Sequence, residues 1–197
     1  MVTPPPGKQR DHPEKLPQGE NNNMNSDTES AIKTMRAGVS LALLTLLYGF
    51  GLGLSFGAAE DSIKGHLHDE AQAVLAQKYG GEQAAADKVS SKSWTYFKRA
   101  HLHANGLGTT SLALIGLMAL VPVPAGRRRT AALLLGAGAL AYSMFWMFAG
   151  LRAPGLGSTG AAKESLAWLA LPGSGACVAG LLLATVSVLK TSFAAAE

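Results

Sequence analysis

Four apolar blocks, each roughly 20 residues long, constrain the fold of this chain more than any other feature of its sequence. They cover about residues 37–59, 102–123, 130–151 and 166–189, and none contains Asp, Glu, Lys or Arg in its interior. A helix of that length crosses a hydrocarbon core of about 30 Å. With only 15% of all residues charged, the sequence predicts an all-α integral membrane protein, a bundle of four transmembrane helices.

The charged residues at the edges of the blocks predict the orientation of the bundle. Basic residues flank the ends expected to face the cytoplasm: Lys33, Arg36, Arg127, Arg128, Arg129 and Lys190. Glu60 and Asp61 follow the first block instead, so we expect both termini in the cytoplasm and residues 60–101 outside, in a membrane such as the bacterial inner membrane. The basic residues are dispersed rather than pooled on one face, so we expect membrane lipid as the partner and no nucleic acid.

The chain divides into a tail and a membrane domain. Residues 1–30 are rich in Pro, Asn and charge, and we expect a disordered cytoplasmic tail there. Residues 31–197 form the membrane domain. Within it, the outer segment 60–101 is long for a connection, and its apolar residues recur at helical spacing until Gly80 and Gly81 interrupt them. We therefore predict a helical outer hairpin between the first two spans.

Four of the five histidines occur in two copies of one tripeptide, His66-Leu67-His68 and His101-Leu102-His103. Both copies are predicted at the outer surface, where neutral imidazole could ligate Zn, Cu or haem iron. Positions i and i+2 of a helix point roughly 200° apart, so only one histidine of each pair should face inward. A site with one histidine from each helix is therefore easier to form than a site with four. Histidines that only contact headgroups, water, Asp69 or Glu70 are the alternative.

Two further sets of residues extend this candidate site. His101, Asn105 and Thr109 are spaced by four and share one helix face, which we expect to look into the bundle because polar groups in lipid are costly. Asn105 would then support His101 by hydrogen bonding. Met144 and Met147 are possible additional soft ligands near the same depth, although methionine more often fills gaps between helices.

The run from His101 to Gly108 fits the pattern H-x-H-x-N-x-x-G, which resembles small four-helix membrane proteins related to subunit I of haem-copper oxidases. Tyr48 with the glycines of the first block, and Gly116-Leu117-Met118 followed by Pro122, support the resemblance. It implies that His101 or His103 binds haem or copper. It does not imply oxidase chemistry.

Two functions follow as hypotheses. The first is a membrane protein that binds haem b or a transition metal, Cu or Zn, as an accessory or electron-transfer component of a respiratory system. The second is a non-catalytic helical subunit or assembly factor of a larger membrane complex. The sequence has no nucleophile paired with a base and no phosphate-binding loop, so we do not expect an enzyme.

Overall fold

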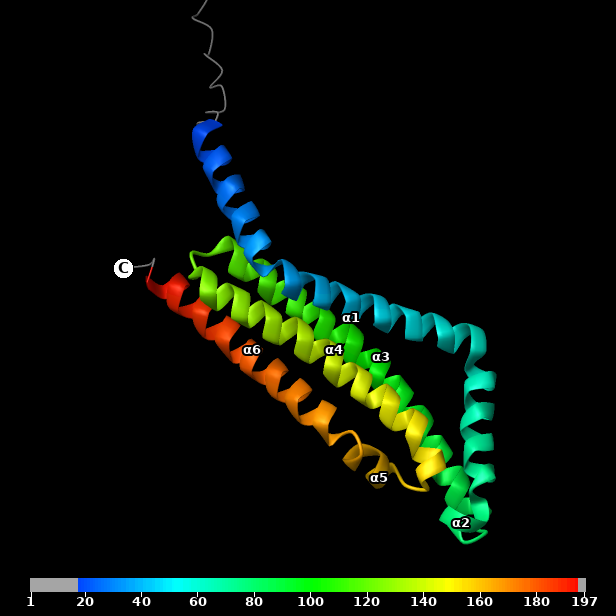
Figure 1. Ribbon diagram of the computed structural model, residues 1–197. Helices are drawn as coiled ribbons and strands as arrows, with labels where there is room; N and C mark the ends of the chain where they lie inside the picture. The colour runs from blue at the N-terminus through cyan, green and yellow to red at the C-terminus, as the bar shows by residue number, and fades with distance from the viewer. Residues whose placement is uncertain (1–17, 195–197) are drawn as a thin grey trace, which may run out of the picture.

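The computed structural model describes the backbone of residues 18–194 and the side chains of residues 26–191, and in that range the chain is helical with short connections. Figure 1 shows its long helices running side by side. The described helices are α1 (Gln18–Ala73), α2 (Leu75–Tyr79), α3 (Gln83–Leu120), α4 (Ala125–Leu156), α5 (Thr159–Glu164) and α6 (Ala167–Ala194). The predicted all-α fold is confirmed.

Three of the helices are long and apolar enough to cross a membrane. They are α1 within Ser26–Ala73, α4 over Ala125–Leu156 and α6 over Ala167–Thr191, and they correspond to three of the four predicted spans. The remaining predicted span, 102–123, lies in α3, which does not meet the same requirement. The polar side chains of His103, Asn105 and Thr109 at the start of that segment lower its hydropathy.

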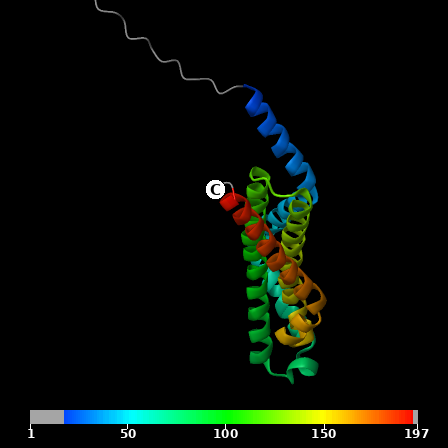
Figure 2. The same ribbon diagram turned by 90° about the vertical axis from the view of Figure 1, so that its left-hand side faces the viewer.

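The first helix is longer than predicted at both ends. It begins at Gln18, so residues 18–30 are helical where we expected the end of a disordered tail, and residues 1–17 lie outside the described part. In both views the first turns of α1 project beyond the other helices (Figures 1 and 2). At the other end, a kink at Ala59 (φ −142°, ψ 24°) redirects α1, which continues to Ala73.

The segment between the first two predicted spans is built from the end of α1, the short helix α2 and the start of α3. Gly80 (φ 63°) and Gly81 (φ 83°) adopt left-handed conformations that favour glycine, and the chain reverses there into α3. Ala71, Tyr79 and Ala86 form a small buried cluster between the three helices. The Tyr79 hydroxyl donates a hydrogen bond of 2.8 Å to the carbonyl oxygen of Pro154, which ties this turn to α4.

Small residues let the long helices approach closely. A Cβ atom added at Gly38 of α1 would overlap the backbone of Ala132 in α4. One added at Gly138 of α4 would lie 2.8 Å from the carbonyl oxygen of Gly173 in α6. Lipid is as apolar as the side chains, so the hydrophobic effect does not drive membrane helices together. Small residues promote their association because they allow close van der Waals contact between the helices. The α1, α4 and α6 helices are therefore held together by backbone proximity.

Candidate functional site

His101 lies where α3 crosses α1, and its imidazole faces α1. The ring nitrogen Nδ1 is 2.8 Å from the carbonyl oxygen of Gly49. A Cβ atom at Gly53, one turn further along α1, would lie 2.8 Å from Cε1 of His101. The ring thus occupies the space that a side chain at position 53 would fill. This contact between the His101 region of α3 and the backbone of α1 explains two of the three glycines that recur at spacing four in α1, Gly49 and Gly53 of the set Gly49, Gly53 and Gly57.

Asn105 lies one turn after His101 in α3, and its side-chain amide contacts His101. Its amide nitrogen is 3.0 Å from the backbone carbonyl oxygen of His101 and 3.2 Å from Nδ1 of the ring. A carbonyl can only accept, so the short contact with Gly49 requires a proton on Nδ1 of His101. The Asn105 amide then donates to the His101 carbonyl. In this tautomer Nε2 of His101 carries a lone pair.

His103 faces a different helix. Its Nδ1 lies 2.7 Å from the carbonyl oxygen of Arg99, one turn earlier in α3. Its ring packs against two aromatic rings of α4, edge-on to Tyr142 at 5.2 Å and stacked near Trp146 at 5.9 Å. The two side chains therefore diverge, as positions i and i+2 of a helix should: His101 contacts α1, whereas His103 contacts α4. Both are half-buried against a neighbouring helix, however, where we expected only one of them to face inward.

An aromatic and cationic cluster surrounds His103. The guanidinium carbon of Arg99 lies 4.9 Å from the centre of the Trp146 ring and 5.6 Å from that of Tyr96. Tyr96 and Trp146 themselves meet edge-on at 5.0 Å. Cation–π contacts of this kind stabilise a partly desolvated arginine. Sequence reasoning missed this cluster, although Tyr96, Arg99 and His103 share a helix face and the aromatics of α4 were visible in the sequence.

The other two histidines lie on the part of α1 that follows the kink, and both are exposed. Leu67 between them is buried, which turns its neighbours outward. His68 Nδ1 lies 3.7 Å from a carboxylate oxygen of Asp87 in α3, beside a cleft of about 320 Å³ that Lys64 and Trp94 also line. Within the described part of the chain, no group of three or more His, Cys, Asp or Glu residues is arranged to hold a metal ion. The structure does not bring the four imidazoles together.

The remaining candidate residues occupy less telling positions. Thr109 is exposed, so it does not share the inward position of His101 and Asn105 that we expected. Met144 and Met147 are half-buried on α4, on either side of the aromatic pair Phe145 and Trp146. The rings that meet His103 are those of Tyr142 and Trp146, in the same segment of α4. The structure is therefore compatible with both interpretations of Met144 and Met147, as fillers of gaps between helices and as additional ligands.

Comparison of the chain with protein-family models, curated proteins and solved structures gives no match.

Proposed function

We propose that this chain is a haem-binding membrane protein and that Nε2 of His101 is the iron ligand. The observation that carries the proposal is the 2.8 Å contact between Nδ1 of His101 and the Gly49 carbonyl oxygen. Metal-ligating histidines almost always donate their other ring N–H to a carbonyl or carboxylate, which fixes the tautomer and the ring direction. His101 has that arrangement, is half-buried, and is supported by Asn105.

The donor set favours haem over a mononuclear zinc or copper site. Structural and catalytic zinc sites take three or four protein ligands, and blue-copper sites also need several. Haem iron receives its equatorial nitrogens from the porphyrin and needs one or two protein ligands. The separated histidines can meet that smaller requirement. The single cysteine, Cys177, cannot provide a C-x-x-C-H attachment, so the group would be a non-covalent haem b.

A bound haem would supply one-electron chemistry, which fits an accessory or electron-transfer component of a respiratory system. His103 is the second candidate ligand, because its Nδ1 is likewise engaged by a backbone carbonyl. Its bond to Arg99 is a contact within one helix turn, however, whereas the bond of His101 joins two helices. The interhelical bond restrains the ring more strongly, which makes His101 the better placed ligand.

The proposed topology has four spans. The segment 102–123 of α3 would be the fourth, because its residues Ala104, Ile115 and Met118 are buried in the bundle with α1 and α4, beside their apolar stretches. Both termini would then lie on the cytoplasmic side of a bacterial inner membrane. The end of α1, the helix α2 and the start of α3 would form the outer hairpin. The basic residues before α1's apolar stretch and at the start of α4 support this orientation.

A second candidate function is that of a non-catalytic helical subunit or assembly factor. The outward face of α1 favours it: Leu47, Phe50 and Leu54 are 69%, 64% and 76% exposed. Lipid would cover such a face in an isolated protein, and a helix of a larger complex would cover it in an assembly. Extraction in a mild detergent followed by sizing separates the two situations. A large complex without haem would favour this second function.

An optical spectrum tests the primary proposal. The full chain is produced in cells supplied with haem precursor, purified in detergent, and measured for a Soret band and for bound Cu and Zn. A Soret band that shifts on reduction is the expected result. A colourless protein from haem-sufficient cells would refute the proposal.

A further inference from the structure

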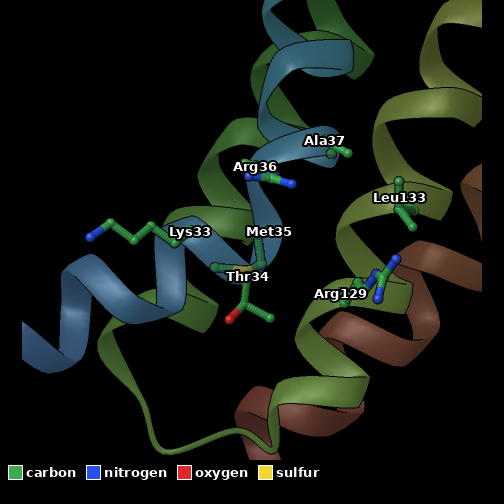
Figure 3. Close-up of a pocket in the computed structure, with 8 residues that line it drawn as sticks. Lys33, Thr34, Met35, Arg36, Ala37, Arg129 and Leu133 are labelled. Atoms are coloured by element: carbon green, nitrogen blue, oxygen red, sulfur yellow. The ribbon is translucent and has the colours of Figure 1, made fainter.

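A pocket of about 450 Å³ opens between the start of the apolar stretch of α1 and the first turns of α4, at the end of the bundle opposite α2 (Figures 1 and 3). Three cationic residues line it, Lys33 and Arg36 from α1 and Arg129 from α4. No acidic residue is among its lining residues. The haem proposal does not use this site, which lies far along α1 from Gly49.

The two arginines of this pocket carry uncompensated charge. Neither Arg36 nor Arg129 forms an ion pair or hydrogen bond with the described side chains, residues 26–191. Figure 3 shows Arg36 pointing from α1 toward α4 and Arg129 lying along α4, whereas Lys33 points away from α4. Lys33 is also paired with Glu29 at 2.7 Å. Arg36 and Arg129 are therefore the cations available to a ligand.

The position of the pocket indicates what kind of anion it would meet. Arg36 directly precedes the apolar block that begins at residue 37, and Arg129 directly precedes the block that begins at residue 130. Leu133, which is half-buried, gives the pocket an apolar side, whereas the Met35 side chain is buried in the core of the bundle. A headgroup phosphate at this depth could contact both guanidinium groups while its acyl chains follow the apolar helices.

We propose that this pocket binds the headgroup of an anionic glycerophospholipid, with Arg36 and Arg129 as the phosphate ligands. Guanidinium groups bind phosphate oxygens in a bidentate manner, and basic pockets between membrane helices on the cytoplasmic side suit anionic lipids. Free inorganic phosphate has the same oxygen chemistry. The lipid is favoured because the half-buried apolar side chain of Leu133 offers nothing to a small hydrated ion.

The neighbouring arginines provide a matched control. Arg127 lies in the same basic run and is exposed like Arg129, but it does not line the pocket. Arg128 is unsuitable as a control because its Nη2 donates a 2.6 Å hydrogen bond to the Val121 carbonyl oxygen, which closes the α3–α4 turn. R127Q therefore removes the same charge as R129Q without touching the pocket or this turn.

The test is native mass spectrometry of the full chain in detergent titrated with phosphatidylglycerol, with phosphatidylcholine and with inorganic phosphate. Wild type and R127Q should bind phosphatidylglycerol alike and phosphatidylcholine weakly. R36Q and R129Q should each lower the affinity for phosphatidylglycerol about fivefold. R36K/R129K should fall between wild type and R36Q/R129Q, because lysine keeps the charge but loses the bidentate contact. Helical circular dichroism confirms that each variant is folded.

Several outcomes would overturn the proposal. An equal loss in R127Q would show that diffuse charge, not this pocket, attracts the lipid. Equal binding of phosphatidylcholine would show that no anionic headgroup is selected. If inorganic phosphate displaced the lipid when added at about the same concentration as the lipid, the pocket would be a site for a small anion. Wild-type affinity in R36Q/R129Q would remove both arginines from the site.

Discussion

The imidazole of His101 on α3 donates from Nδ1 to the carbonyl oxygen of Gly49 on α1, across 2.8 Å and 52 positions of sequence. This bond joins two helices through a backbone acceptor that any residue could supply. What only glycine supplies is the space beside it, at Gly53, where the ring lies.

Gly53→Ala should destabilise the α1–α3 contact. The new Cβ atom would lie 2.8 Å from Cε1 of His101, so the ring must move and weaken its bond to Gly49. We expect a loss of about 1–3 kcal/mol in the free energy of unfolding, measured by circular dichroism in detergent. Gly51→Ala is the control, because a Cβ there meets nothing within 4 Å. A variant at position 53 as stable as the control would contradict the predicted overlap.

Gly38→Ala should weaken the packing of α1 on α4. The added Cβ would overlap the backbone of Ala132, which cannot move aside as a flexible side chain can. A cost of about 1–3 kcal/mol is expected, because helices forced apart lose dispersion contacts along their length. Gly116→Ala in α3 places its Cβ in open space and should not lower the melting temperature, because alanine favours helix more than glycine does. Equal melting temperatures of Gly38→Ala and Gly116→Ala would show that α1 and α4 do not approach closely at Gly38 in solution.

Alkaline pH should loosen the turn that contains α2. Burial raises the pKa of the Tyr79 hydroxyl, which donates to the Pro154 carbonyl oxygen at 2.8 Å. The protonated hydroxyl is needed for this bond, so its stabilisation is fully present below about pH 10, the usual tyrosine value. It is lost as the pH rises through the higher pKa of the folded protein. Tyr79→Phe should cost about 1 kcal/mol near neutral pH.

Denaturant titrations that measure the unfolding free energies of wild type and Tyr79→Phe at pH values below and above about 10 test whether this bond is lost at alkaline pH. The difference between the two proteins should shrink as the pH rises above about 10. Comparison with the variant removes the contribution of other titrating groups. A difference that stays constant would show that ionisation of Tyr79 does not break this hydrogen bond, and equal stabilities near neutral pH would show that the bond does not contribute to stability.

Cysteine labelling in intact cells tests the proposed orientation. In a Cys177→Ala background, a cysteine at Gly81 should react with an impermeant reagent from outside. Cysteines at Arg127 and Thr191 should react only after the membrane is permeabilised. All three positions are exposed or half-exposed, so burial in the protein does not explain protection. Labelling from outside at position 127 but not at position 81 would show that the topology is the inverse of the one proposed.

Much of the fold could be predicted because long apolar blocks specify helices almost alone. The predicted spans 37–59 and 130–151 lie within α1 and α4, and α6 covers the predicted span 166–189 except for Leu166; all three helices are long and apolar enough to cross a membrane. The limits of these helices were less predictable. Helix α1 runs from Gln18 to Ala73, since neither the polar start nor Glu60 and Asp61 interrupts helical backbone. Only the kink at Ala59 marks the end of the apolar block.

The candidate site could be predicted in part. The spacing of His101 and His103 indicated that they face different directions, and the structure turns them toward α1 and α4. Which helix each one meets depends on how α3 is rotated within the bundle, and periodicity in one segment cannot supply that. The exposure of His66 and His68 follows from the burial of Leu67, which competes with them for the inner position.

The most direct test of the account is the Soret absorbance of His101→Ala, purified beside wild type and His66→Ala from haem-supplied cells. Wild type and His66→Ala should carry equal haem per chain, since His66 is exposed and turned outward on α1 beside the buried Leu67. His101→Ala should lose the Soret band while it keeps its helical circular dichroism. A Soret band of full intensity and unchanged position in folded His101→Ala would contradict the assignment of His101 as the iron ligand.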